Sequence, residues 1–512
     1  MKNMKVKSFL LAIPLLMTGL VGCGSGNNDQ PSQEPSIAPS VAPSTDDSSA
    51  APSVSKVTVK FWHTFGQTVV DGLQAKIKTF AELVKQNDGV DVTIDMKYQG
   101  GYDDIAKKIS DGYSVMNTPT IAVAYPDNVA DYIEVGKSAN AEYVVNLDQF
   151  IKSNEVGFGK EKWLGDKYDE EDFIEDFFEE GSAYTLEGTY SLPFLKSTEI
   201  MFYNMDMLVE VMKGYKPEFN NSKSKIKEYM SRLNWNDFID LCSYVKTNTM
   251  TNPDFNVLEV PMWYDSDANL FVTKMYQNKI PYASIEEGKG KIGFRDETNF
   301  AKTVDMLDGF RQLYKDGLML TKGIKNTYGS DYFTGEKCLF SIGSSGGSGY
   351  NFPQADAFEL GVCRVPVSNN NPLYVSQGPT LAMFNDRGLA EDVNEATKLY
   401  AWKFMKYITN GQVNAEICVN GSEGYIPVRH SAYETAFFQE FMEEGERYAM
   451  CYKVVVDDVN SDAGYLVSPA FKGSAALRDE CGSLLTAALN AANKEAIPAL
   501  VNTAISNAML KM

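Results

Sequence analysis

The chain has 512 residues, of which 44% are hydrophobic and 22% are charged, and its formal net charge is −21. This length allows two lobes with substantial cores, and an acidic chain of this size repels nucleic acid, so we expect no nucleic-acid partner. The sequence has 2 histidines and no C-x-x-C spacing, so we expect no metal centre and no other cofactor. The cysteines beyond Cys23 are widely spaced, and a disulfide such as Cys338 with Cys363 stays open.

Residues 1–22 have the pattern of a secretory signal. Three lysines precede an apolar run, Phe9 to Val21, that is too short for a stable membrane-spanning helix. The run ends in Leu-Val-Gly-Cys, which resembles a bacterial lipobox. This resemblance implies a lipoprotein signal peptide and a diacylated Cys23 that anchors the protein to the extracellular face of the bacterial cell membrane; an ordinary signal peptide that contains a cysteine is the alternative. Residues 23–56 are rich in Pro, Ser and other small residues, and we expect a disordered tether because they have too little apolar surface to offset the entropy of ordering.

Alternating strands and helices follow the tether. Residues 57–62 and 91–98 alternate between apolar and polar as strands do, and residues 119–125 are typical of a buried strand. A helical pattern runs from 69 to 85, and another helix is expected to begin near Gly100. This order predicts an α/β domain with a largely parallel sheet, and ligands then bind at the C-terminal ends of the strands.

The stretch from residue 188 onward predicts a passage between two lobes. Residues 188–193 read as a short strand closed by a proline, and residues 199–203 are apolar and aromatic enough for a second, buried strand. Asn204 and Asp206 supply N-cap chemistry for a helix that begins near Met207. A strand that stops at a proline and restarts after a bend can carry the chain from one lobe into the next.

The acidic run at residues 169–180 predicts a helix and not a calcium site. Phe173 and Phe177 lie four residues apart, which gives a helix with one buried edge and a solvated acidic face. The spacing does not fit an EF-hand loop.

Several motifs together resemble one family. The pattern G-x-x-Y-x-L-P-F, S-T, Y-N-x-D-x-L at residues 188–208, the turn and strand at 331–343 and the segment 424–430 are similar to family 1 extracellular solute-binding proteins, the ligand receptors of ABC importers. The resemblance implies a two-lobed α/β fold of the periplasmic-binding-protein type II class, with a ligand cleft between lobes joined by hinge strands. By the family's topology, lobe one is expected at 57–196 and 374–418, and lobe two at 197–373 and 419–512.

Aromatic residues near predicted strand ends are candidate ligand contacts. A sugar or polyol presents an apolar face of C–H groups and a rim of hydroxyls, which suit aromatic rings and polar groups respectively. Each of these rings is also a candidate for ordinary core packing. The aromatic candidates are Trp62, Tyr102, Tyr125, Trp263 and Tyr425.

Within the family, the chain is most similar to the glycerol-3-phosphate and glycerophosphodiester receptors, through Phe61-Trp-His, Ser344-Ser-Gly and related segments. One departure is Pro126, with Asp127 next to it, where the subgroup has an acid that holds the glycerol hydroxyls. Arg478 is expected either to bind a phosphate through its planar fork or to pair with a neighbouring acid. The complete set of expected ligand-binding residues is Trp62, His63, Tyr102, Tyr125, Asp127, Ser197, Trp263, Ser344, Ser345, Gly378, Tyr425 and Arg478.

The function that follows from the resemblance is that of a binding protein and not an enzyme. We expect a monomeric solute-binding lipoprotein of an ABC importer that captures a carbohydrate or a glycerol-phosphate-type polyol by lobe closure and delivers it to the permease. A ligand-binding sensor for a signalling partner is one alternative. A serine hydrolase is another, because residues 343–347 match G-x-S-x-G, but that motif needs a helix after Ser345 and a histidine base.

Overall fold

The computed structural model describes residues 54–251, 255, 257–355, 357–421, 424–445, 447–459, 461 and 463–512. The predicted signal peptide, Cys23 and the tether up to residue 53 lie outside the described residues. Within the described ranges, no helix has both the length and the apolar character needed to cross a membrane.

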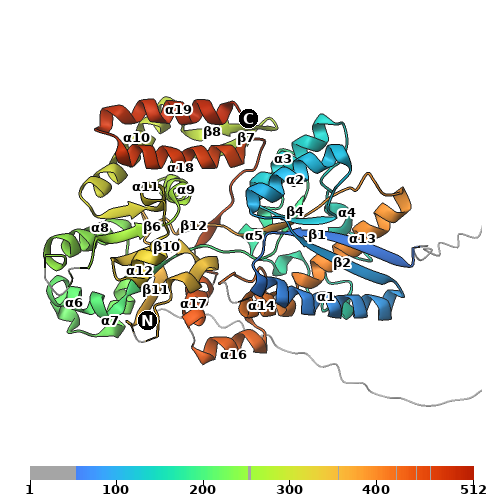
Figure 1. Ribbon diagram of the computed structural model, residues 1–512, viewed down its shortest axis with the longest axis horizontal. Coiled ribbons are helices and arrows are strands. Elements are labelled where there is room, and N and C mark those ends of the chain that lie inside the picture. The colour runs from blue at the N-terminus through green and yellow to red at the C-terminus, as the bar shows by residue number, and fades with distance from the viewer. Residues whose placement is uncertain are drawn as a thin grey trace, which may run out of the picture. The chain divides into compact units, whose positions relative to one another are not determined.

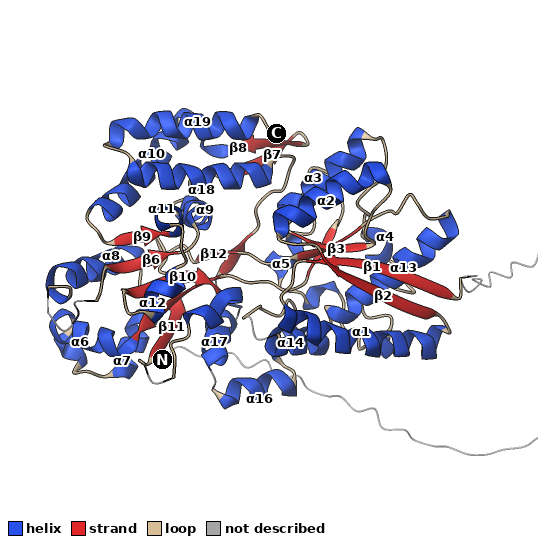
Figure 2. Ribbon diagram, in the orientation of Figure 1, coloured by secondary structure: helices blue, strands red, loops and turns tan. Residues whose placement is uncertain are grey.

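The first sheet has the strand order β2-β1-β3-β13-β4 (Figures 1 and 2). β1 pairs in parallel with β2 and β3, whereas β13 is antiparallel to both β3 and β4. The three early strands predicted from the sequence are confirmed, and the sheet is mixed because β13 runs opposite to its two neighbours. The strands are β1 (Lys56–His63), β2 (Asp91–Tyr98), β3 (Ile121–Ala124), β4 (Ser191–Pro193) and β13 (Thr380–Met383).

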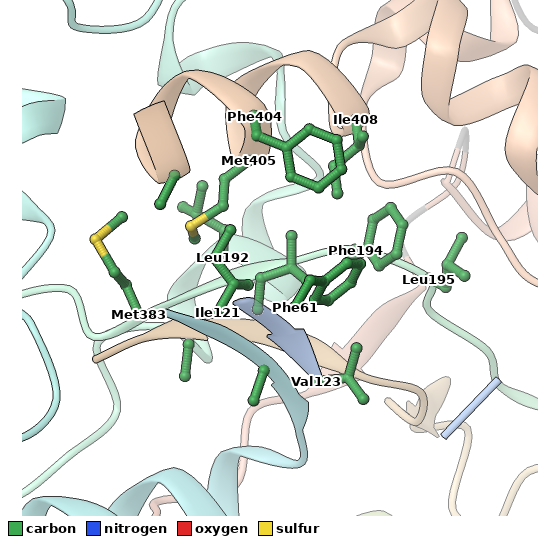
Figure 3. Packing of buried hydrophobic residues seen from close by; sticks show 14 of the residues in the cluster. Phe61, Ile121, Val123, Leu192, Phe194, Leu195, Met383, Phe404, Met405 and Ile408 are labelled. Carbon is green, nitrogen blue, oxygen red and sulfur yellow. The ribbon is translucent and has the colours of Figure 1, made fainter. Parts of the chain in front are cut away.

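Helices α1 (Gln67–Asp88) and α13 (Glu391–Ile408) pack together on the Phe61 face of this sheet. The rings of Phe80 and Phe404 have centroids 5.1 Å apart, and that of Phe404 lies 6.0 Å from Phe61. Figure 3 shows Phe404, Met405 and Ile408 of one helix directed at the strands. Strand residues alternate between faces, and the other face carries α2 and α3. The helices of this part are α1 (Gln67–Asp88), α2 (Tyr102–Val115), α3 (Pro126–Ser138), α4 (Asp148–Ile151), α13 (Glu391–Ile408), α14 (Gly411–Asn420), α15 (His430–Tyr433) and α16 (Ala436–Glu444).

The second sheet has the order β11-β5-β10-β6-β9. β5 is antiparallel to β10 and β11, and β6 is parallel to β9 and β10. Its strands are β5 (Glu199–Asn204), β6 (Val260–Tyr264), β9 (Met319–Thr321), β10 (Cys338–Ser344) and β11 (Leu360–Arg364). Its helices are α6 (Met205–Tyr215), α7 (Lys223–Ser231), α8 (Trp235–Tyr244), α9 (Asp267–Gln277), α10 (Glu297–Lys315), α11 (Lys322–Lys325), α12 (Gly329–Thr334), α17 (Arg447–Val459), α18 (Ser474–Asn490) and α19 (Ile497–Met509).

The chain passes from the first sheet to the second at residues 194–198, between β4 and β5 (Figure 1). The predicted strand, bend and strand are therefore confirmed. The side-chain oxygen of Asn204 accepts a hydrogen bond from the Met207 amide at 2.9 Å and caps α6, as expected. Two small sheets complete the fold: β7 (Ala283–Glu286) with β8 (Lys289–Ile292), and β12 (Leu373–Val375) with β14 (Gly464–Leu466).

The buried apolar residues form two large clusters, one for each sheet. The first gathers residues between 57 and 195 and between 374 and 470, and the second gathers residues between 201 and 365 and between 466 and 508. The fold is thus α/β with two lobes, each assembled from discontinuous segments of the chain.

The predicted single helix over 169–180 is wrong. The run forms a 3₁₀ turn (Glu170–Asp172) and the short helix α5 (Glu175–Glu179), separated by Phe173 in extended backbone. The reason is long-range pairing, because Phe173 forms an antiparallel bridge with Arg429 and is pulled out of helical geometry. Phe173 and Phe177 are both buried, as the spacing predicted.

The six cysteines after Cys23 are all buried and free, so the suggested Cys338–Cys363 disulfide does not form. Cys338 lies in β10 and Cys363 in β11, and β5 lies between these two strands in the sheet.

Candidate ligand-binding site

Two tyrosines at the C-terminal edge of the first sheet form an aromatic pair. Tyr102 begins α2 and Tyr125 caps α3, and their ring centroids are 4.3 Å apart. Burial raises the pKa of Tyr102 well above its usual value, and the nearby Tyr125 and Tyr425 raise it further. Burial also raises the pKa of Tyr125, although Arg478 opposes the shift. Both phenols therefore stay protonated at neutral pH and keep a hydroxyl that can donate or accept.

Arg478 joins this aromatic pair from the second lobe. It lies in α18, and its Nη2 is 3.0 Å from Oδ2 of Asp127 in the first turn of α3. The guanidinium carbon lies 5.2 Å from the centroid of the Tyr125 ring, at cation–π distance. The acid that pairs with Arg478 is thus Asp127 of the other lobe and not a sequence neighbour.

A second ion pair, which is buried, joins Lys196 of the crossing segment to Glu180. Nζ of Lys196 is 2.5 Å from Oε2 of Glu180, and their side chains are 1% and 8% exposed. The same Nζ lies 3.5 Å from the carbonyl oxygen of Gly378. A buried cation of this kind is stable only when a carboxylate compensates its lost hydration.

Tyr125 and the two ion pairs line one cavity of about 50 Å³ between the two lobes. Four of the expected residues, Tyr125, Asp127, Gly378 and Arg478, contribute to its wall. The remaining lining residues are Pro126, Glu180, Lys196, Asn269, Val272, Tyr282, Ala283, Val375, Ser376, Leu466, Ser468, Pro469, Phe471, Ser474 and Leu477.

The expected serines meet where the crossing segment approaches the end of β10. The hydroxyl oxygens of Ser197 and Ser344 are 3.3 Å apart. The Ser345 hydroxyl accepts a hydrogen bond from the Thr198 amide at 3.2 Å, and Ser345 is 1% exposed. The Tyr425 ring packs on Gly346, where an added Cβ would lie 3.1 Å from the ring.

Ser345 does not have the surroundings of a hydrolase nucleophile. It begins a 3₁₀ turn (Ser345–Asn351) and not an α-helix. Among the described residues, neither His63 nor His430 hydrogen-bonds to it, and its hydroxyl is held by the Thr198 amide. Within the described part of the chain, Ser345 therefore has no histidine beside it to act as a general base.

The structure places Trp62, His63 and Trp263 away from the cavity. Trp62 lines a separate cleft of about 520 Å³ with residues of β2 and α2. His63 is 3% exposed, accepts a hydrogen bond from the Phe65 amide at 3.2 Å, and has a pKa lowered by burial. Trp263 is fully buried in β6 and packs on Tyr332, with ring centroids 4.3 Å apart.

Sequence reasoning missed several residues of the cavity wall. Lys196 was visible in the crossing motif, but nothing local indicated that Glu180 lies beside it. Tyr282 and Phe471 come from irregular segments that no periodicity marks. Phe471 also borders a larger open cleft of about 900 Å³ along β7, β8 and the end of α19. Residues of both lobes line the larger cleft as well, but we favour the smaller cavity as the ligand site because two ion pairs and four of the expected residues converge on it.

A known family matches more than half of the chain. The family model described as bacterial extracellular solute-binding protein matches residues 77–443. The chain belongs to this family. No curated sequence matches this solute-binding protein.

Solved structures of similar fold cover most of the solute-binding protein. The cyclic alpha-maltosyl-1,6-maltose binding protein from Arthrobacter globiformis has a TM-score of 0.63 and 16% identity, covering 89% of this chain and 99% of that one. An ABC substrate-binding protein from Listeria monocytogenes in complex with cycloalternan has a TM-score of 0.59 and 13% identity, covering 88% and 98%. UgpB from Mycobacterium tuberculosis in complex with glycerophosphocholine has a TM-score of 0.57 and 15% identity, covering 88% and 99%. At these identities the likeness establishes the two-lobed fold and not the ligand.

Proposed function

We propose that the protein is the solute-binding lipoprotein of an ABC importer and captures a carbohydrate or a glycerol-phosphate-type polyol between its lobes. The observation that supports this most directly is the cavity between α3 and α18, where aromatic rings and paired charges from both lobes meet. Aromatic faces suit the C–H face of a sugar, and the polar groups suit its hydroxyls. The ligands named for the similar structures, which include two oligosaccharides, agree with this class of ligand.

Within this proposal the lobe boundaries are the ones expected from the sequence, 57–196 with 374–418 and 197–373 with 419–512, except that α15 and α16 pack in the cluster of the first lobe. The proposed ligand contacts are the expected residues that lie at or beside the cavity. They are Tyr102, Tyr125, Asp127, Ser197, Ser344, Gly378, Tyr425 and Arg478. Lipidation of Cys23, attachment to the extracellular face of the membrane, a monomeric state and delivery to permease subunits belong to the same proposal and rest on the sequence and the family.

Ligand capture requires the lobes to separate. Sites for small ligands measure about 300–1,000 Å³, whereas this cavity measures about 50 Å³. A sugar therefore reaches the site only when α3 and α18 move apart, and the lobes then close on it. The ligand stabilises the closed arrangement because it contacts both lobes only there.

A thermal-melt screen tests the proposal. The purified protein is heated with neutral oligosaccharides, monosaccharides, glycerol-3-phosphate and glycerophosphodiesters. A ligand at about one hundred times its dissociation constant stabilises the fold by roughly 2.7 kcal/mol, which is a shift of a few degrees. We expect at least one saccharide or polyol-phosphate to give such a shift, and the shift to be lost in Tyr125→Ala. Ester turnover that disappears in Ser345→Ala, with no ligand in the panel raising the melting temperature, would instead favour a hydrolase.

A further inference from the structure

Both cations of the ligand cavity are already paired with carboxylates of the same wall. Arg478 pairs with Asp127 at 3.0 Å, and Lys196 pairs with Glu180 at 2.5 Å. Among the described residues, these four are the charged side chains that line the cavity. The wall therefore has two positive charges, two negative charges and no net charge.

The Lys196–Glu180 pair is buried, and the Arg478–Asp127 pair is partly buried. The side chain of Lys196 is 1% exposed and that of Asp127 is 11% exposed, whereas that of Arg478 is 33% exposed. Charges interact more strongly in such surroundings than in water because the effective dielectric constant is lower. An anion that approaches Arg478 meets the Asp127 carboxylate on the same guanidinium and Glu180 in the same cavity. A cation that enters the cavity is repelled in the same way by the positive charges of Arg478 and Lys196.

The Arg478–Asp127 pair is held in place from several directions. Asp127 lies in the first turn of α3, where the positive end of the helix dipole favours a carboxylate. Arg478 lies at cation–π distance from the ring of Tyr125, which caps the same helix. Displacing Asp127 from Arg478 therefore costs a charge pair and also disturbs the contact of α18 with α3.

Hydroxyl groups fit this wall better than ions do. A hydroxyl both donates and accepts hydrogen bonds, so a polyol can accept from the remaining N–H groups of Arg478 and donate to the oxygens of Asp127 without breaking their pair. Tyr282 and Phe471 line the cavity as well and offer apolar surface to C–H groups.

We propose that Asp127 and Glu180 determine specificity: by neutralising Arg478 and Lys196 they restrict the cavity to uncharged polyhydroxyl ligands, such as neutral saccharides, and exclude phosphate esters. This inference rests on the proposed function and chooses between the two ligand classes that the function leaves open. It assigns Arg478 the role of a hydroxyl donor and not that of a phosphate receptor.

The test frees Arg478 from its partner. In Asp127→Asn the side chain keeps its size and loses its charge, so Arg478 gains an unpaired positive charge in the cavity. By calorimetry, we expect the affinity of Asp127→Asn for glycerol-3-phosphate and for inorganic phosphate to exceed that of wild type, or the detection limit where wild type shows no binding, by roughly tenfold or more. The matched control is Asp479→Asn, which removes the same charge one residue after Arg478 but does not line the cavity, and it should bind neither anion.

The opposite change provides a second, independent variant. Arg478→Gln leaves Asp127 and Glu180 against Lys196 alone, so the cavity becomes net negative. We expect this variant to gain roughly tenfold or more in affinity for the cationic sugar glucosamine relative to glucose, compared with wild type. Melting curves without ligand show that each variant is folded before binding is measured.

The outcomes separate this inference from the proposed function. Binding of glycerol-3-phosphate by wild type that Arg478→Gln abolishes would overturn the inference and assign the phosphate role to Arg478. Unchanged anion affinity in folded Asp127→Asn, or an unchanged glucosamine preference in Arg478→Gln, would also overturn it, even when neutral saccharides bind. If neither saccharides nor polyol phosphates bind wild-type protein, the proposed function itself fails.

Discussion

Glu199 is an acid that the fold buries at the start of the hinge strand β5. The Tyr264 hydroxyl donates a hydrogen bond to Oε2 of Glu199, and the amide of Asn269 donates to Oε1 at 3.2 Å. Burial raises the pKa of Glu199 from 4.5 to about 8, although these hydrogen bonds oppose the shift. The group is therefore protonated at neutral pH in the folded protein. Asn269 also lines the cavity, so a single side chain, that of Asn269, separates the protonated Glu199 from the proposed ligand site.

The buried acid predicts a pH dependence of stability. Between the unfolded pKa of 4.5 and the folded pKa of about 8, the folded state holds a proton that the unfolded chain releases. The free energy of unfolding therefore falls as pH rises through this window, by up to about 1.4 kcal/mol per pH unit from this group. Glu199→Gln removes that contribution. Urea unfolding between pH 5.5 and 7.5 should show the variant gaining stability relative to wild type as pH rises.

Other buried acids shift in the same direction. Burial raises the pKa of Asp265 to about 6 and that of Asp458 to about 7. They are present in wild type and in Glu199→Gln alike, so the comparison isolates Glu199. Glu297→Gln, at an exposed position at the start of α10, is the control and should follow wild type. A constant stability difference between wild type and Glu199→Gln across the pH range would show that the prediction is wrong.

Ser197 and Gln377 lie on two extended segments that run side by side where the chain crosses between the sheets. The amide of Ser197 donates to the carbonyl of Gln377 at 2.9 Å, and the amide of Gln377 donates to the carbonyl of Ser197 at 2.8 Å. Gly378 follows with φ +86°, and an added Cβ there would lie 2.1 Å from the carbonyl oxygen of Leu195. Only glycine combines this backbone conformation with so close an approach.

At the scale of this element, Gly378→Ala should destabilise the protein. The left-handed backbone alone costs about 1–2 kcal/mol for a residue with a Cβ, and the contact with Leu195 adds to it. Urea unfolding measures the loss. The matched control is Gly309→Ala in the middle of α10, where an added Cβ meets no atom within 4 Å. That control should raise stability by about 0.5–1 kcal/mol, and equal effects at the two positions would contradict the argument.

At the scale of the whole molecule, α3 of the first lobe touches α18 of the second on one side of the cavity. The Arg478–Asp127 ion pair is one of these contacts. Another is the hydrogen bond from the Gly473 amide, at the start of α18, to Oδ1 of Asp131 at 3.0 Å. In the proposed mechanism of capture, ligand binding breaks such contacts and forms them again, so they set the rate at which the cavity becomes accessible.

We expect Asp131→Ala to speed ligand association. Losing a hydrogen bond of about 1 kcal/mol raises an opening rate roughly fivefold. In stopped-flow fluorescence with a neutral saccharide, the observed rate for wild type should level off at high ligand concentration, and the plateau should rise in the variant. Glu134→Ala is the control, because Glu134 pairs with Lys137 within α3 and should leave the plateau unchanged. A rate that increases linearly with ligand, without a plateau, would show that opening does not limit binding.

The sequence by itself determined the early strands, the helix that Asn204 caps and the crossing at residues 194–198. These are local properties, because strand alternation, helical spacing and cap chemistry act between residues a few positions apart. The family pattern also gave Gly378 and Arg478 as expected ligand contacts, and Asp127 was expected beside Pro126, where the pattern is broken; these three residues line one cavity.

Only the tertiary structure decided the partners within that site. Asp127 and Arg478 are far apart in the sequence. Their pairing depends on how α3 packs in the first lobe and α18 in the second. Trp62 shows the same limit: strand alternation gives it a face of β1, but the helix opposite that face decides that it lines a cleft with α2 and not the cavity. Long-range contacts follow from strand order and packing, which no local pattern of residues encodes.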